Sequence, residues 1–244
     1  MATSTPAHMT PARRRQPASR TSLLAGAGGL LFLVLVAVQN LLKAATNPSD
    51  TASAAQILRF AHDQAWSVDL LVVTYVIGFP ALFLYAGGLT RRCEQLAPAA
   101  EIWGRLGRSS VGVIAVLFGL VNVLQVVLVA SRGDLAGDPA LVRILWTTHN
   151  AVFTLNLLAV AGALLGLGRA AMLAGLVPRW MGPVSAIGSA LLAIAAAPAV
   201  AEVQGSNLLI VGLVGFLCWL LLLALSGIRL VRDGIDKDRS ASTT

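Results

Sequence analysis

Six long apolar runs occupy most of the 244-residue chain, and short polar segments separate them. The runs cover residues 22–42, 66–89, 110–130, 144–168, 181–200 and 208–230. Each run approaches or exceeds the roughly 20 residues that an α-helix needs to cross about 30 Å of hydrocarbon. The pattern therefore predicts an all-α polytopic membrane protein, built as a bundle of six transmembrane helices.

The connection between the first two runs has a helical pattern of its own. Asn47-Pro48-Ser49-Asp50 predicts a turn and a helix cap. Apolar residues then recur at helical spacing, at Ala54, Ile57, Leu58, Phe60 and Ala61. The pattern predicts a short amphipathic helix on the outer side of the bundle. Two placements stay open: a helix lying on the membrane surface, or an extramembrane helix packed on the bundle.

The composition is typical of a chain whose surface is largely solvated by lipid. Hydrophobic residues make up 57% and charged residues 12% of the chain, whereas a soluble domain carries about 25% charged residues. We therefore expect the lipid bilayer as the main partner. The predicted parts are a disordered basic cytoplasmic tail at 1–20, a six-helix transmembrane domain at 21–232 and a second cytoplasmic tail at 233–244.

The basic residues orient the six runs. With the N-terminus inside, the inner segments hold fourteen Lys and Arg residues, and the outer segments hold four, Lys43, Arg59, Arg132 and Arg143. Basic residues concentrate in the cytoplasmic loops of membrane proteins. The distribution predicts a multi-pass protein of the cell membrane with both termini cytoplasmic. It also accounts for the formal net charge of +7 without a nucleic-acid partner.

The fourth run is unusually polar. On a helical projection at about 100° per residue, His149, Asn150 and Asn156 share one broad arc, and aliphatic residues occupy the opposite arc. Lipid offers polar side chains no hydrogen-bond partners. We therefore expect this arc to face protein or water.

Depth groups the polar residues further. At about 1.5 Å per residue, His149 lies about 8 Å and Asn156 about 18 Å below the outer edge of the membrane. The polar residues of the second and third runs fall in the same outer half. The resulting hypothesis is a polar pocket that opens to the extracytoplasmic side. Its predicted lining residues are Asp69, Tyr75, Asn122, Gln125, His149, Asn150 and Asn156.

A packing role accounts for the same residues. Asn and Gln side chains hydrogen-bond between membrane helices, so Asn122 and Gln125 would pin the third helix to the fourth. Asp69 is shallow enough for a rim salt bridge to Arg59 or Arg143. Both alternatives, pocket and packing seam, follow from the sequence.

Enzyme chemistry is not favoured. Asp69 is the only acidic residue inside a run, so paired-carboxylate catalysis is not expected. His149 alone cannot supply the two axial ligands of a bis-histidine haem. Cys93 and Cys218 lie at different depths and form no CxxC motif of the kind that indicates a zinc site. We predict no catalytic residue, no metal site and no cofactor.

Two segments carry a resemblance to a known family. They read Trp146-Thr-Thr-His-Asn-Ala-Val-Phe-Thr-Leu-Asn156 and Gly175-Leu-Val-Pro-Arg-Trp-Met-Gly182. With its hydropathy pattern and its short outer helix, the chain resembles a family of uncharacterised six-helix integral membrane proteins, common in actinobacteria and classed as a domain of unknown function. The resemblance covers most of residues 20–232. It implies fold and location, and no site residue.

Two functions follow. The sequence favours a non-enzymatic scaffold, sensor or accessory subunit with a membrane-protein partner. The alternative is a carrier or receptor for a small solute that binds in the outer polar pocket. A hydrated cavity around His149 and Asn122 would indicate the second function, whereas a dry hydrogen-bonded seam would indicate the first.

Overall fold

The computed structural model describes residues 18–197 and 209–242, and within these ranges the regular structure is entirely helical. The predicted all-α polytopic membrane architecture is confirmed. The elements are α1 (Ala18–Thr46), α2 (Ala54–Asp63), α3 (Ala65–Leu96), the 3-10 helix η1 (Pro98–Ala100), α4 (Glu101–Ala130), α5 (Arg132–Leu135), α6 (Pro139–Leu173), α7 (Met181–Ala196) and α9 (Leu209–Ser242). The predicted N-terminal tail lies outside the described residues, apart from the first turn of α1.

The number of long membrane-crossing helices differs from the predicted six. In the described part of the chain, five helices are long and apolar enough to cross a membrane: α1, α3, α4, α6 and α9. The fifth predicted run is α7, an apolar helix of 16 residues. At 1.5 Å per residue such a helix spans about 24 Å, which is short of the hydrocarbon core. Residues 198–200 of that predicted run lie outside the described residues.

Several helices extend beyond their predicted apolar runs. The connection between the second and third runs is mostly helical, because α3 continues to Leu96 and α4 begins at Glu101, with only Ala97 and η1 between them. At the other end of the chain, α9 continues past the predicted limit of 230 to Ser242. Asp233 stabilises this extension, since it lies 3.2 Å from Arg229 on the same helix and 3.6 Å from Arg92 on α3.

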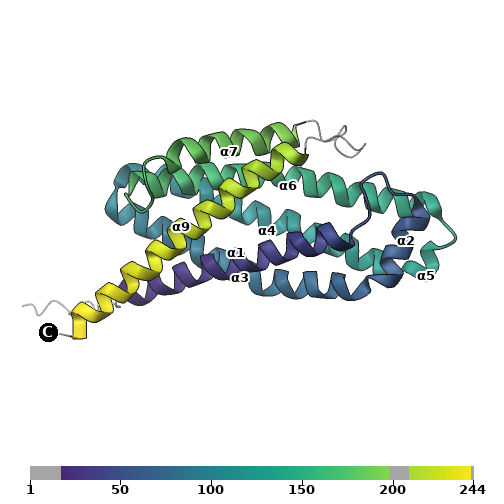
Figure 1. Cartoon of the computed structure of the whole chain (residues 1–244), viewed down its shortest axis with the longest axis horizontal. Coiled ribbons are helices and arrows are strands. Elements are labelled where there is room, and N and C mark those ends of the chain that lie inside the picture. Colours follow the sequence, from purple (N-terminus) through teal and green to yellow (C-terminus); the bar gives the residue numbers. More distant parts are fainter. Residues whose placement is uncertain (1–17, 198–208, 243–244) are drawn as a thin grey trace, which may run out of the picture.

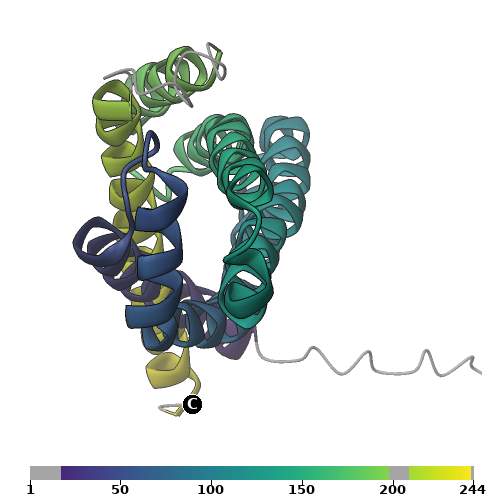
Figure 2. The same cartoon turned by 90° about the vertical axis from the view of Figure 1, so that its right-hand side faces the viewer.

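Six helices form a closed ring. Each packs against two neighbours in the order α1, α3, α4, α6, α7, α9 and back to α1. Figure 2 shows this ring from one end, with α4 and α6 on one side, α1, α3 and α9 on the other, and α7 between α6 and α9. A ring of this kind has no central helix, so side chains must fill its interior.

The two ends of the bundle differ. One end carries α2 and α5 and is called the α2 end below (Figure 1). The opposite end carries the start of α1, the α3–α4 and α6–α7 connections and the last turns of α9. At this opposite end, the interior contains the fully buried Tyr85 of α3, whose hydroxyl lies 2.6 Å from Ser226 Oγ of α9.

Glycines bring neighbouring helices into backbone contact. A Cβ atom on Gly166 of α6 would collide with the backbone of Gly107 on α4, and a Cβ on Gly26 of α1 would lie 2.6 Å from the carbonyl oxygen of Gly227 on α9. Small residues allow such close approach, and van der Waals packing then holds the helices together without a hydrophobic driving force. The ring therefore closes through contacts that only glycine permits.

The short helix α2 packs on the bundle, which is the second of its two predicted placements. Its N-cap is Ser53, whose side chain and that of Gln56 form a reciprocal capping box. Its apolar face is buried through Ile57, Phe60 and Ala61, and the Phe60 ring lies 6.1 Å from the Trp146 ring of α6. This face contacts protein and is therefore not free to lie in lipid.

The glycine contact between α4 and α6 yields a stability prediction. Gly166→Ala places a methyl group against the Gly107 backbone, so we expect the free energy of unfolding to fall by about 1–3 kcal/mol. Gly112→Ala on α4 is the matched control, since a Cβ there meets open space, and helix propensity predicts a gain of up to about 1 kcal/mol. Unfolding in detergent measures both variants, and equal effects would contradict the contact.

Candidate ligand-binding cavity

A cavity of about 440 Å³ lies inside the ring, between α1 and α6. Small-molecule sites commonly enclose about 300–1,000 Å³. The walls come from α1, α3, α4, α6 and α9, and the connection at residues 47–50 adds lining residues at the α2 end. The cavity therefore joins five helices that are far apart in the sequence.

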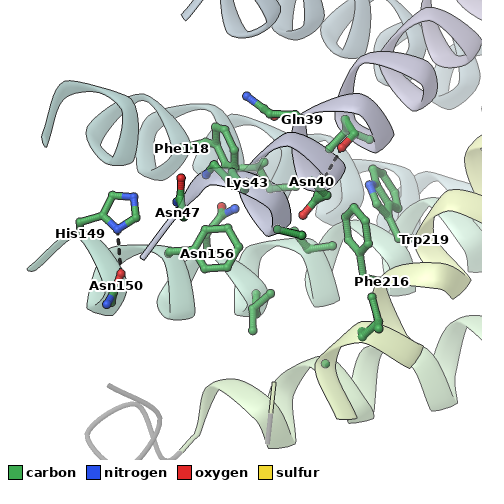
Figure 3. Close-up of a pocket in the computed structure, with 18 of the residues that line it drawn as sticks. Gln39, Asn40, Lys43, Asn47, Phe118, His149, Asn150, Asn156, Phe216 and Trp219 are labelled. Atoms are coloured by element: carbon green, nitrogen blue, oxygen red, sulfur yellow. Dashed lines mark hydrogen bonds between the residues drawn. The ribbon is translucent and has the colours of Figure 1, made fainter. Parts of the chain in front are cut away.

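The cavity wall is polar toward the α2 end and apolar toward the middle of the bundle. The polar lining residues are Gln39, Asn40, Lys43, Asn47, Asp50, His149, Asn150 and Asn156. The deeper lining consists mainly of Phe32, Val36, Phe79, Ile114, Leu157, Val160, Phe216 and Trp219. In Figure 3, His149 and Asn150 lie at one end, Lys43 and Asn156 in the middle, and Phe216 and Trp219 at the other end.

Lys43 is the most unusual residue of the wall. Its Nζ lies 4.6 Å from the centre of the Phe118 ring and 4.9 Å from that of Phe153. The atom is shielded from solvent and has no hydrogen-bond partner among the described residues. Cation–π contacts of this kind contribute about 0.5–2 kcal/mol, but an ammonium group also has three N–H donors to satisfy. The described part of the cavity wall thus contains a cation without an acceptor.

His149 lies on the polar wall in a fixed orientation. Its ring stacks on that of Trp146, with centroids 4.7 Å apart and planes within 8°. Its Nδ1 is 2.8 Å from Asn150 Oδ1, while its Nε2 has no partner in the described part of the protein. Trp146 in turn donates from Nε1 to the Ser49 carbonyl oxygen at 3.2 Å. This bond holds the α1–α2 connection over the cavity.

Unpaired polar atoms gather around this one cavity. Among the described lining residues, the buried atoms without a hydrogen-bond partner are Lys43 Nζ, Asn47 Oδ1, His149 Nε2, Asn150 Nδ2 and Asn156 Oδ1. Leaving one buried donor or acceptor unpaired costs about 1–3 kcal/mol. A bound polar group would remove part of this cost, so the arrangement suits a ligand with hydrogen-bonding atoms at one end.

The structure brings three of the seven predicted pocket residues to the cavity. His149, Asn150 and Asn156 line it, and all three are buried. They share the arc of α6 that faces α1 across the ring, as the helical projection suggested. The other four predicted residues do not line it.

Those four residues have other surroundings. The Tyr75 hydroxyl donates to the Ala115 carbonyl oxygen at 3.1 Å and links α3 to α4. Asn122 donates to the Phe118 carbonyl oxygen of its own helix, and Gln125 is fully buried without a partner for its amide. Asp69 is exposed and forms no ion pair with Arg59 or Arg143.

The described α4–α6 contact does not depend on a hydrogen-bonded seam. The hydrogen bonds found for Asn122, Asn150 and His149 stay within their own helices. Polar links between helices occur elsewhere, such as Gln39 Nε2 to Thr74 Oγ1 at 3.2 Å and Ser189 Oγ to the Ala161 carbonyl oxygen at 2.9 Å. Glycine packing, rather than amide bonding, brings α4 and α6 together.

Sequence reasoning missed Lys43 and the aromatic residues around it. Gln39, Asn40 and Lys43 lie within about one helical turn, so they share a face of α1. That spacing is a signal for a polar patch on this face of α1. Phe118 and Phe153 carried no signal, because aromatic residues are common in any membrane helix.

Metal chemistry and relatives add little to this geometry. In the described part of the chain, no group of three or more His, Cys, Asp or Glu side chains gathers at metal-binding distance. Comparison with protein-family models, with curated proteins and with solved structures returned no match. The resemblance to an actinobacterial six-helix family therefore stays a prediction.

Removing the Lys43 charge should stabilise the free protein. Lys43→Met keeps a flexible apolar side chain and eliminates an unpaired buried cation, so we expect the free energy of unfolding without ligand to rise by about 1–3 kcal/mol. Lys43→Arg is the matched control and should give no such gain, because it keeps the charge. Unfolding in a neutral detergent measures both. A Lys43→Met variant that is less stable than the wild type would show that the cation is already satisfied.

Proposed function

We propose that this protein is a non-enzymatic membrane receptor for a small solute that binds in the cavity between α1 and α6. The observation that carries the proposal is the cavity itself, whose wall includes the shielded Lys43 ammonium, for which residues 18–197 and 209–242 provide no acceptor. Proteins rarely retain such a group for stability. Retention for binding explains both the space and the unpaired polar atoms around it.

The cavity distinguishes a receptor from a pure scaffold. A scaffold would fill the ring interior at both ends, as it is filled around Tyr85, which is fully buried. At the α2 end, by contrast, His149 and Asn156 border open volume. A cavity beside His149 supports the solute-binding alternative that the sequence left open, although Asn122 is not part of it.

The charge distribution supports entry from the extracytoplasmic side. The α3–α4 connection and the last turns of α9 lie at the end opposite α2 (Figure 1). The turns of α3 and α4 that flank this connection carry Arg91, Arg92, Arg105 and Arg108, and α9 carries Arg229 and Arg232. Under the positive-inside rule this end is cytoplasmic, in a cell membrane, and the polar wall of the cavity faces outward.

Helix continuity favours a receptor over a carrier. Carriers commonly bind their substrates between discontinuous helices. Here α3 runs from Ala65 to Leu96 through Pro80, and the other four long described spans are also unbroken. Binding without alternating access is the simplest use of such a frame.

A cavity-filling variant tests the proposal. Val36 of α1 lines the cavity, so Val36→Phe should occupy part of it. Val34 is 54% exposed on the outside of the same helix, which makes Val34→Phe the matched control. In a thermal-unfolding screen of lipids and small metabolites, a ligand present at 100 times its Kd adds about 2.7 kcal/mol. That corresponds to a rise in Tm of about 5 °C or more.

We expect at least one compound to raise the Tm of the wild type and Val34→Phe but not that of Val36→Phe. A screen in which every active compound stabilises all three proteins alike would contradict the receptor proposal. Flux of an active compound into proteoliposomes would instead identify a carrier.

A second pair of variants compares a predicted pocket residue that lines the cavity with one that does not. His149→Ala removes a cavity-wall side chain and should weaken binding of a compound from this screen by about tenfold, the loss of one good hydrogen bond. Asn122→Leu changes a buried residue outside the cavity and should leave the affinity unchanged. Titration of the Tm shift measures both affinities. Equal losses would place Asn122 in the site and contradict the geometry.

A further inference from the structure

The charge of the cavity wall indicates which class of solute it accepts. We propose that the ligand is an amphiphile with one compact anionic head group, a carboxylate or a phosphate, that pairs with Lys43, and with an apolar chain that extends toward Trp219. This inference rests on the proposed receptor function and names its ligand class.

The head group is inferred from the Lys43 ammonium, which has no hydrogen-bond acceptor among the described residues. Lys43 is the only Lys or Arg side chain among the described residues that line the cavity. The one acidic lining residue, Asp50, is exposed at the rim and lies in the α1–α2 connection. An unpaired cation within a membrane span is costly, and charged partners normally accompany it. An anionic ligand supplies the acceptor that the described residues lack there.

Neutral polar groups complete the head-group region. Asn150 Nδ2 is an unpaired donor, and Asn156 adds an amide to the same wall. His149 Nε2 is also unpaired in the described structure. The His149 ring is only 4% exposed, and its stacking on the Trp146 ring fixes its orientation. The Lys43 ammonium and the Asn150 amide N–H groups suit carboxylate or phosphate oxygens, which accept charge-assisted hydrogen bonds. His149 Nδ1 donates to Asn150 Oδ1, so Nε2 of the neutral ring is an acceptor and suits the hydroxyl of a protonated phosphate or carboxyl group.

The chain is assigned from the shape and apolarity of the deeper wall. Along α1 the lining runs from Lys43 to Phe32, eleven residues or about 16 Å at the helical rise. An extended chain covers about 1.2 Å per bond, taken from 3.3–3.6 Å per three-bond residue, so about a dozen bonds fit this length. Phe79, Phe216 and Trp219 offer aromatic and aliphatic contact over that distance.

The aromatic rings do not favour a cationic ligand. Phe118 and Phe153 resemble the aromatic cages that bind ammonium groups, but the Lys43 ammonium already lies over both rings. A second cation would meet like-charge repulsion at close range. A neutral amphiphile would leave Lys43 unpaired, so it should bind more weakly than an anionic one of the same chain length.

Three probes with a common dodecyl chain test the head-group preference. Dodecyl phosphate, dodecanol and dodecyltrimethylammonium are titrated into the full chain in phosphatidylcholine nanodiscs, and affinity is read from the Tm shift. We expect dodecyl phosphate to bind at least about tenfold more tightly than dodecanol, and the cation to bind most weakly. Lys43→Met should abolish the preference, and Lys43→Arg should keep it.

The outcomes separate this inference from the receptor function. Equal affinity of dodecyl phosphate and dodecanol for the wild type, or tighter binding of the cation, overturns the anionic assignment while the receptor proposal stands. If none of the three probes binds, while another compound binds and Val36→Phe blocks it, the anionic assignment is also overturned and the receptor proposal stands. If neither the probes nor the screen yields a ligand sensitive to Val36→Phe, both proposals fail. Should Lys43→Met not fold, the three head groups on the wild type decide the question.

A further arm identifies the source of the anion. Nanodiscs that contain phosphatidylglycerol should raise the Tm of the wild type, but not of Lys43→Met, if a membrane lipid is the natural occupant, and they should then compete with dodecyl phosphate. Unchanged Tm and unchanged dodecyl phosphate affinity would assign the site to a free amphiphile. Both results support an anionic head group. Competition that persists in Lys43→Met would contradict pairing with this residue.

Discussion

The closed ring of six helices is the constraint on which the rest of the structure depends. Because α1 packs against both α3 and α9, the two ends of the helical order meet, and none of the described helices occupies the centre. Glycine contacts such as Gly107 with Gly166 draw the helices inward. The interior must then be filled by side chains. Around Tyr85 and Ser226 it is filled, whereas at the α2 end it holds a cavity.

The ring also explains why polar residues collect in that cavity. Lipid surrounds the outside of the long helices, where exposed residues such as Val34, Val116 and Ile144 are apolar. Several polar side chains on the same helices, such as Gln39, Asn122 and His149, are buried in the interior, because lipid cannot satisfy their hydrogen bonds. Lys43, on α1, reaches across to Phe118 and Phe153 on two other helices of the ring. Space, charge and unpaired hydrogen-bonding atoms therefore coincide at one place.

Much of the fold could be predicted from the sequence, and only part of the site. Apolar runs located five long spans because membrane thickness sets a minimum helix length, while α7, with 16 residues, is shorter than its apolar run suggested. Depth placed His149 and Asn122 in the same half of the bundle. Depth does not determine which way a residue faces, and that depends on the order of helices around the ring, which no local pattern encodes. His149 therefore lines the cavity, while Asn122 bonds within its own helix.

The Lys43 ammonium lies in the cavity wall, over two aromatic rings, where it can pair with an anion. Only two lysines occur in the chain, Lys43 and Lys237. Selective ¹⁵Nζ labelling of lysine therefore gives two NMR signals, and Lys237 serves as an internal reference. We expect the Lys43 signal to be displaced by ring currents from Phe118 and Phe153 and to move on addition of dodecyl phosphate, while the Lys237 signal stays fixed. A Lys43 signal that matches Lys237 and does not respond to dodecyl phosphate would contradict the account.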